Sequence, residues 1–321
     1  MYTVILRNNI KLDDLKMEIS LSESIDSIAY TADIKLVIPE EMSKNLLLME
    51  GDPIEIIKNE NPGKGTVFKG IIWHKSTDAK HNKVGGLTCK ERTIYIEKSE
   101  DEYLFKGGTT ATQRAKQMCG DWGIPIGNFA DTGIPLAKSP PKIGTIYGMM
   151  LDDLRETAEK GGGLYKYRME NKLDLVKLGS NKVVHDISNI LESINQIGSL
   201  EGAVSKVKVL GKKEDNAKSP VIGVFEKDTA KLGTLQKVIQ DEKIKDTATA
   251  KSRAESLFNK GEGSISVSCI DVPEIRAGDK VELNGFYIYV TSVTHKLGEP
   301  GRMDLVLESL KQIRRKYYAR S

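Results

Sequence analysis

The chain of 321 residues is 39% hydrophobic and 29% charged, a globular composition with enough length for about two or three domains. Its 48 basic and 45 acidic residues leave a formal charge of +3. This near-balance gives no electrostatic reason to expect nucleic acid or an anionic membrane as the main partner. The sequence contains no run of about 18 apolar residues, so it predicts no membrane span.

The N-terminal segment alternates apolar and polar residues and lacks the apolar core of a signal peptide. Three cysteines, Cys89, Cys119 and Cys269, are too few and too scattered for a disulfide framework, and no CxxC pair indicates zinc. Sparse cysteine use is typical of a reducing compartment. We therefore expect synthesis in the cytoplasm without ordinary secretion.

The N-terminal third of the chain predicts short antiparallel strands. Its apolar or alternating segments are separated by clusters of turn formers and lie at 2–6, 15–21, 29–38, 54–57, 67–73, 86–91 and 93–97. The segment from Pro39 to Met42 predicts a short helical turn. Several short strands at this spacing favour a small antiparallel barrel or sandwich.

Two helices are predicted after the strands. Thr109 or Thr110 caps a helix that runs to about Trp122, with apolar residues at steps of three and four. A loop rich in proline and glycine follows. Thr145 caps a second helix, which the glycines at 161–163 end.

The second half of the chain mixes strands and helices. Segments 164–168 and 172–178 flank Glu170-Asn171 and predict a hairpin. A strand is predicted at 203–210, and Asp246 caps a further helix. Segment 264–309 predicts strands again, and the last twelve residues form a basic tail.

A weak internal repeat links the two ends of the chain. In both copies a Gly-Asp pair precedes a strand, a turn, an apolar strand ending in histidine, and a strand ending in glutamate: Gly51-Asp52, His74 and Glu91 in the first, Gly278-Asp279, His295 and Glu308 in the second. Gly-Asp suits a turn before a strand. The repeat predicts a duplicated β-module in which the Gly-Asp pairs superpose and the two histidines lie at equivalent strand ends.

No residue is predicted to be catalytic, to bind a cofactor or to bind a metal. The four histidines (His74, His81, His185 and His295) form no HExxH motif and no i,i+4 pair. Lys64 is interpreted as a hairpin tip because no phosphate-loop spacing surrounds it. Cys89 and Cys119 are expected to be buried fillers. The tail from Arg314 to Arg320 could contact nucleic acid, but docking on a neighbouring subunit is favoured.

Three C-terminal segments carry a resemblance to a known family. Segments 275–283 (IRAGDKVEL), 287–295 (YIYVTSVTH) and 303–308 (MDLVLE) resemble the C-terminal block of the XkdQ/YqbQ family of defective prophages and phage-tail-like bacteriocins of Gram-positive bacteria. Segment 232–242 and the helix after it are similar to the preceding part of that family. Segments 27–36 and 67–71 resemble its N-terminal module, so the resemblance covers nearly the whole chain.

The resemblance implies a baseplate hub protein related to the central hubs of myophages, to gpD-like proteins and to the N-terminal part of VgrG spikes. It implies a homotrimer with two similar β-barrels in each subunit. The implied partners are a hexameric ring of the tail tube protein, a separate spike or tail-tip protein, other baseplate proteins and the tape measure. Assembly into a phage tail or tailocin particle released by lysis is also implied.

We therefore expect a mainly β protein with α+β inserts. A first β-barrel domain is predicted over 1–105, an α+β domain over 106–182, and a second β-barrel domain over 183–321 with a helical insertion near 229–262. The expected function is structural, not enzymatic: adapting a six-fold tail tube to a three-fold spike and nucleating tube assembly. The alternatives are a tail-associated cell-wall hydrolase or wall-binding module, and a nucleic-acid-binding protein.

Overall fold

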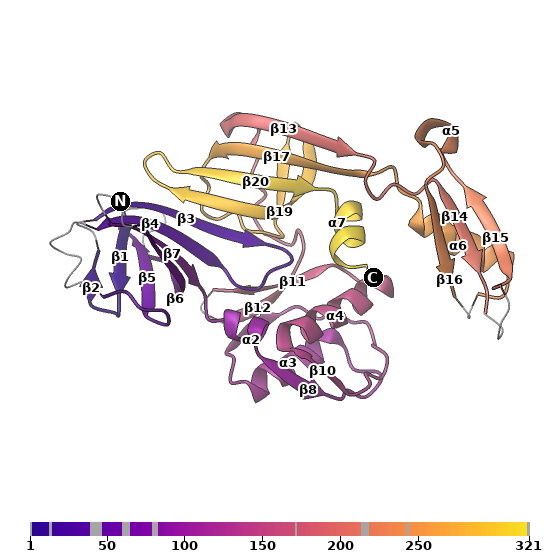
Figure 1. The fold of residues 1–321 in the computed structure, drawn as a ribbon, viewed down its shortest axis with the longest axis horizontal. Helices are drawn as coiled ribbons and strands as arrows, with labels where there is room; N and C mark the ends of the chain where they lie inside the picture. The colour runs from indigo at the N-terminus through magenta and orange to yellow at the C-terminus, as the bar shows by residue number, and fades with distance from the viewer. Residues whose placement is uncertain are drawn as a thin grey trace. The chain divides into compact units, whose positions relative to one another are not determined.

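A computed structural model describes residues 2–12, 15–38, 47–59, 65–78, 83–170, 172–212, 218–241 and 244–319. The chain divides into two compact units, one of residues 1–195 with 265–321 and one of residues 196–264. The predicted mainly β fold with helical inserts is confirmed (Figure 1). None of the described helices combines the length and the apolar character that a membrane crossing needs.

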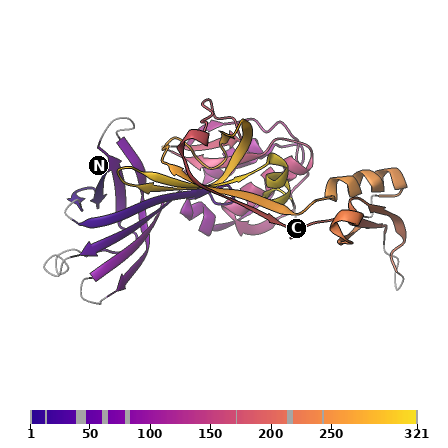
Figure 2. The same cartoon turned by 90° about the horizontal axis from the view of Figure 1, so that it is seen from above.

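The larger unit is organised by one twelve-stranded sheet. Its N-terminal strands are β1 (Tyr2–Leu6), β2 (Ile10–Lys11), β3 (Lys16–Ser24), β4 (Thr31–Ile38), β5 (Pro53–Lys58), β6 (Gly65–Asp78) and β7 (Lys83–Lys90). Its C-terminal strands are β13 (Leu191–Ser199), β17 (Glu262–Ile270), β18 (Lys280–Leu283), β19 (Phe286–Leu297) and β20 (Arg302–Glu308). The last residues of β13 and the first of β17 belong to the smaller unit. Figure 2 shows the N-terminal strands, in indigo and purple, spreading apart as this part of the sheet curves.

Hydrogen bonds follow the order β13-β17-β20-β19-β3-β4-β7-β6-β5-β1-β2, and β18 also pairs with β19. The two predicted β-modules, β1–β7 and β13 with β17–β20, are thus consecutive parts of one sheet. Alternating residues of strands such as β4 and β20 face a core, as a half-buried strand requires. Val4, Ile34 and Ile56 belong to the N-terminal core, and Val267 and Leu305 to the C-terminal one.

An α+β region follows β7 within the larger unit. It contains α2 (Ile94–Lys98), β8 (Glu100–Tyr103), α3 (Ala111–Asp121), β9 (Ile126–Phe129), β10 (Lys142–Thr145), α4 (Ile146–Glu159), β11 (Tyr165–Met169) and β12 (Leu173–Lys177), and the short η1 (Ser188–Ile190) lies beyond it. Thr110 caps α3 in a capping box with Gln113, and Thr145 caps α4, as predicted. The predicted hairpin of β11 and β12 is also confirmed, although Asn171 lies outside the described residues.

Two local predictions in this region are wrong. Segment 93–97 is not a strand, because Thr93 instead precedes the helix α2. Ile94 and Ile96 are buried and Tyr95 is exposed, a two-residue alternation that so short a helix shares with a strand. The expected loop between α3 and α4 contains the strands β9 and β10, which pair with β12 and β8 respectively.

The smaller unit has its own sheet and core. β14 (Lys206–Leu210) lies between β15 (Val221–Glu226) and β16 (Gln236–Gln240), and α5 (Thr229–Leu232) and α6 (Thr247–Leu257) complete it. Val207 and Val209 pack with Ala250 and Ala254 of α6, and Asp246 caps α6 as predicted. The inserted unit therefore begins well before the predicted 229–262 and contains a sheet as well as helices.

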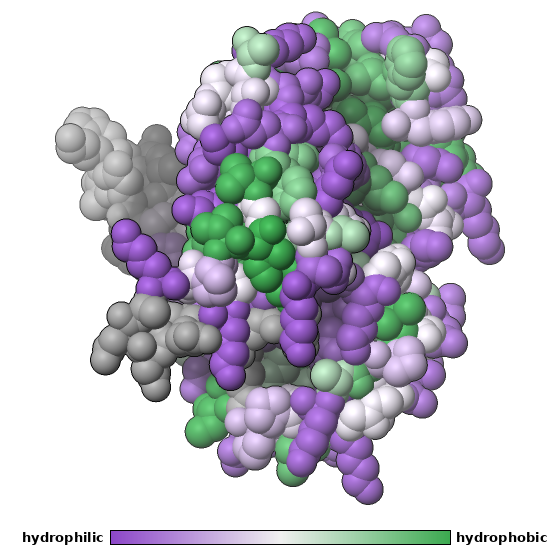
Figure 3. Space-filling view, turned by 90° about the vertical axis from the view of Figure 1, so that its right-hand side faces the viewer, coloured by the Kyte–Doolittle hydropathy of each residue, from purple (hydrophilic) through white to green (hydrophobic). Residues whose placement is uncertain are grey.

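The sheet face of this unit opposite α6 remains exposed. Val224, Lys208 and Val238 form one row across the three strands, and Val221, Val224 and Val238 are all exposed. Figure 3 shows apolar side chains gathered among hydrophilic ones on the side that faces right in Figure 1.

The C-terminal tail forms α7 (Leu310–Tyr317), capped by Ser309. Ile313 and Tyr318 are buried with the α+β region. Arg314 Nη1 and Nη2 donate to the carbonyl oxygens of Ala158 and Gly162, 2.6 and 2.9 Å away. The described part of the tail thus packs within its own chain, and docking on a neighbouring subunit stays a prediction.

Candidate assembly site

The two Gly-Asp pairs form turns with the same hydrogen bonds. Gly51 N donates to Ile72 O and Ile72 N to Asp52 O, at 2.8 and 2.9 Å. Gly278 N donates to Val290 O and Val290 N to Asp279 O, at 2.7 and 2.9 Å. Both glycines have a left-handed φ, +89° and +93°, which explains glycine at each position. The predicted repeat is thus confirmed at its turns.

Each aspartate closes its turn in the same way. Met49 N donates to Asp52 Oδ2 and Arg276 N donates to Asp279 Oδ2, both at 2.9 Å. An arginine then pairs with each carboxylate, Arg7 with Asp52 at 2.7 Å and Arg168 with Asp279 at 2.9 Å. These two arginines come from different parts of the fold, so sequence repetition could not reveal that they are equivalent.

The strands after the two turns also correspond. A register shift lies between Ile72 and His74 of β6, and another lies between Val290 and Ser292 of β19. Such bulges bend a strand at a fixed point. Ser292 therefore takes the place of His74, while His295 lies three residues further along β19. The prediction that the two histidines are equivalent is wrong, because it rested on residue identity and not on strand register.

A seam joins the two modules within the chain. β3 pairs with the part of β19 beyond its bulge, from Ser24↔Ser292 to Ile19↔Leu297. Ile25, the residue after β3, donates from its backbone N to Thr291 O at 2.9 Å. The end of β3 thus lies against the bulge and the Gly-Asp turn of the second module.

A buried group of charges closes this seam. Glu23 Oε1 lies 3.0 Å from Lys166 Nζ, and Glu23 Oε2 lies 2.8 Å from Arg276 Nε. The same Oε2 accepts from Ala277 N at 3.2 Å, and the Arg276 guanidinium lies 4.4 Å from the ring centre of Tyr30. Glu23 therefore ties β3 to β11 and to the loop before β18.

Electrostatics in this group favour the ionised form of Glu23. Burial alone would raise the pKa of this carboxyl, but the charges of Lys166, Arg276 and Arg168 outweigh burial and hold the pKa well below its usual value. Burial lowers the pKa of Lys166 against the opposing attraction of Glu23. Sequence analysis missed all of these residues, because a buried ion pair between distant segments leaves no local pattern.

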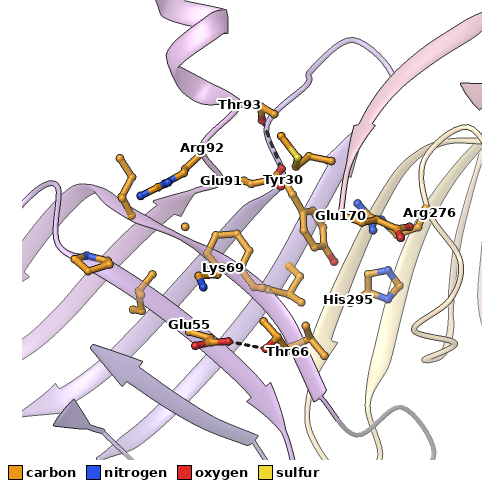
Figure 4. Close-up of a pocket in the computed structure, with 18 of the residues that line it drawn as sticks. Tyr30, Glu55, Thr66, Lys69, Glu91, Arg92, Thr93, Glu170, Arg276 and His295 are labelled. Carbon is orange, nitrogen blue, oxygen red and sulfur yellow. Dashed lines mark hydrogen bonds between the residues drawn. The ribbon is translucent and has the colours of Figure 1, made fainter. Parts of the chain in front are cut away.

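A cavity of about 1060 Å³ lies beside this group. Tyr30, Phe68 and Leu297 give it apolar walls, and Figure 4 shows Arg276, Glu170 and His295 together at one side. The ring nitrogens of His295 lie 2.6 Å from Asp271 Oδ1 and 3.0 Å from Ile275 O. His295 therefore fixes the loop before β18 onto β19.

Glu91 lines the same cavity but has the opposite electrostatics from Glu23. Burial raises its pKa to about 8, although Arg276 opposes the shift. Its Oε2 accepts from Thr93 Oγ1 at 3.5 Å (Figure 4). This carboxyl is therefore mostly protonated at neutral pH.

The remaining predicted residues do not gather into one place. Cys89, Cys119 and Cys269 are buried free thiols, and burial raises their pKa values to about 12, 12 and 11. The described His, Cys, Asp and Glu residues form no group that could hold a metal ion. His81 and Lys64 lie outside the described residues.

Two phage-type tail proteins of known structure share this fold at low sequence identity. A 43 kDa tail protein of prophage MuSo2 from Shewanella oneidensis superposes with a TM-score of 0.71 at 11% identity, covering 96% of this chain and 98% of its own. A tail protein from Neisseria meningitidis MC58 gives 0.67 at 14% identity, covering 98% and 99%.

A type VI secretion component also has this fold. The E. coli c3393 protein, which exhibits structural similarity to the T4 bacteriophage tail proteins gp27 and gp5, gives a TM-score of 0.54 at 9% identity, covering 96% of this chain and 77% of its own. No curated protein sequence matches the chain. The model of the YQBQ-like family matches residues 19–308, and the chain belongs to that family.

Proposed function

We propose that this protein is the structural baseplate hub subunit of a contractile injection system, without catalytic activity of its own. In this role it adapts a six-fold tail tube to a three-fold spike and nucleates tube assembly. The observation that carries the proposal is the duplicated module, with equivalent Gly-Asp turns and a strand seam between its two copies. Because each chain contains two similar modules, a trimer contains six such modules, which can match a six-fold tube.

The free edges of the sheet are consistent with a closed ring. β13 lies at one end of the strand order. Beyond Ile72, the edge of β6 equivalent to the β19 edge that receives β3 has no strand partner among the described residues. Exposed edges of this kind pair readily with another chain. In the proposed homotrimer, β13 of each subunit pairs with β6 of the next.

The remaining partners follow from the same proposal. They are the tube ring, a separate spike or tail-tip protein, other baseplate proteins and the tape measure. We place the protein in a phage tail or tailocin particle, assembled in the cytoplasm and released by lysis. The three domains predicted from the sequence remain a proposal for how these contacts are divided along the chain.

Purified protein should form a homotrimer of the 35.5 kDa chain, alone at high concentration or with the tube and spike proteins. Light scattering coupled to size exclusion measures the mass directly. A stable dimer or tetramer in every mixture would contradict the proposal. A monomer in isolation would direct the measurement to the mixtures, because oligomer formation is concentration-dependent and coupled to partner binding.

The non-enzymatic proposal has a separate test. Incubation of the folded protein with purified peptidoglycan should release neither muropeptides nor stem peptides. The matched controls are the His74→Ala and His185→Ala variants, which should be indistinguishable from the parent protein. Reproducible release that disappears in a folded point variant would instead establish the wall-hydrolase alternative.

A further inference from the structure

The pairing of β3 with β19 within the chain indicates how β13 and β6 of two copies can pair in the proposed homotrimer. We propose that the two are chemically unlike: β13 of one copy seats on β6 of the next through apolar side chains, without the buried ion pairs that join β3 to β19. This inference rests on the proposed function and names the partner surface as a second copy of this chain.

The first observation concerns the inserting strands. β3 and β13 each have nine residues. β3 is next to β4, which pairs with β7, and β13 is next to β17, which pairs with the equivalent strand β20. Aligned end to end, Ile19 corresponds to Ile194, and Ile25 after β3 corresponds to Leu200 after β13. Ile19 and Ile25 are 8% and 3% exposed, whereas Ile194 and Leu200 are 51% and 57% exposed.

Ile19 is buried in the N-terminal core, against which Leu297 of β19 packs, and Ile25 is buried with the α+β region. The corresponding side chains on and after β13 are open. A second copy that repeats the geometry of the β3–β19 seam would bring its β6 beside β13 and reduce the exposure of Ile194. Burial of apolar surface of this kind is the main favourable contribution to most protein associations.

The second observation concerns the receiving surface. Trp73 takes the place of Thr291 at the bulge, and Met49 takes the place of Arg276 beside the turn. Thr291 is buried by its own chain, whereas Trp73, Met49 and nearby Leu47 are exposed. Beside the turn and the bulge, the receiving surface of β6 therefore offers apolar side chains where the inner seam has Arg276.

The third observation is that neither partner of the Glu23–Arg276 ion pair has a charged counterpart in the seam between copies. Arg276 is replaced by Met49, and the strand alignment replaces Glu23 by Gly198. A seam with only one of the two charges would bury it unpaired, at a cost that commonly exceeds the gain from packing. With neither charge, two copies can meet without desolvating an ion, which suits a contact that forms between separate molecules.

The test transplants the ion pair of the inner seam into the outer one. Met49→Arg and Gly198→Glu are made singly and together, and sedimentation over a range of concentrations measures self-association. Met49 is exposed, and a side chain at Gly198 meets nothing within 4 Å and needs no positive φ, so both changes leave the monomer folded. Val183→Arg, another exposed apolar position, is the matched control.

Each single variant should weaken association by about tenfold, because it places an unpaired charge in an apolar seam. The double variant should recover at least the association of the parent protein, and Val183→Arg should leave it unchanged. Equal effects for the single and double variants would overturn the seam while leaving a trimeric hub intact. Failure of the parent and the double variant to associate under any condition, including with the tube and spike proteins, would overturn the proposed function as well.

Discussion

Replacing Glu23 by alanine is expected to lower the free energy of unfolding by about 3–5 kcal/mol. Glu23 is buried and lies within 3.0 Å of the charged groups of both Lys166 and Arg276. Its removal leaves two cations buried in the seam, and Ala277 N loses its acceptor. The loss should therefore be much larger than that of an ordinary surface ion pair.

Glu18→Ala is the matched control on the same strand. Glu18 is exposed and lies 3.5 Å from the exposed Lys35, so its loss should cost less than about 1 kcal/mol. Urea unfolding at pH 7 measures both variants. The lowered pKa of Glu23 also requires that its contribution be lost as the pH falls below the ordinary value of 4.5. Equal costs for the two variants would refute the role of the buried group.

Replacing Glu91 by glutamine should have the opposite sign and stabilise the protein at neutral and alkaline pH. The raised pKa keeps the folded carboxyl protonated up to about pH 8, while the unfolded chain releases this proton near 4.5. Between these values, the stability of the parent protein falls by up to ~1.4 kcal/mol per pH unit. Glutamine resembles the neutral acid and avoids this loss.

The difference between Glu91→Gln and the parent should accordingly be smallest below pH 4.5 and largest above about pH 8. Unfolding in urea at several pH values from 4 to 9 gives the profile. The exposed Glu102→Gln in β8 provides the control and should show no such trend. A difference for Glu91→Gln that stays constant with pH would mean that this carboxyl is ionised in the folded state.

Local patterns in the sequence predicted most of the secondary structure. Strands such as β3 and β4 alternate apolar and polar residues, and Thr110, Thr145 and Asp246 are capping residues that act within one turn. These signals are local, so the sequence carries them without any knowledge of the fold. The sequence did not predict the helix α2, because a segment of five residues is too short to distinguish the helical period from the two-residue period of a strand.

The sequence predicted the turns of the repeat correctly but not the equivalence of the strands that follow them. The Gly-Asp turns are visible because a positive φ selects glycine and an aspartate accepts the backbone hydrogen bonds of its own turn. The equivalence of the following strands depends on register, which the bulges at Ile72 and Val290 set. The sequence repeat therefore aligned His74 with His295, whereas the strand register shows that His74 is equivalent to Ser292.

By itself, then, the sequence determined a mainly β chain with a duplicated turn-and-strand module and the family to which it belongs. Only the tertiary structure decided that both modules share one sheet, that residues 196–264 form a separate unit, and that Glu23 meets Lys166 and Arg276. The physical reason is the range of the interactions. Caps, turns and alternation act over a few neighbouring residues, whereas strand pairing and buried charges join segments whose separation along the chain leaves no periodic signal.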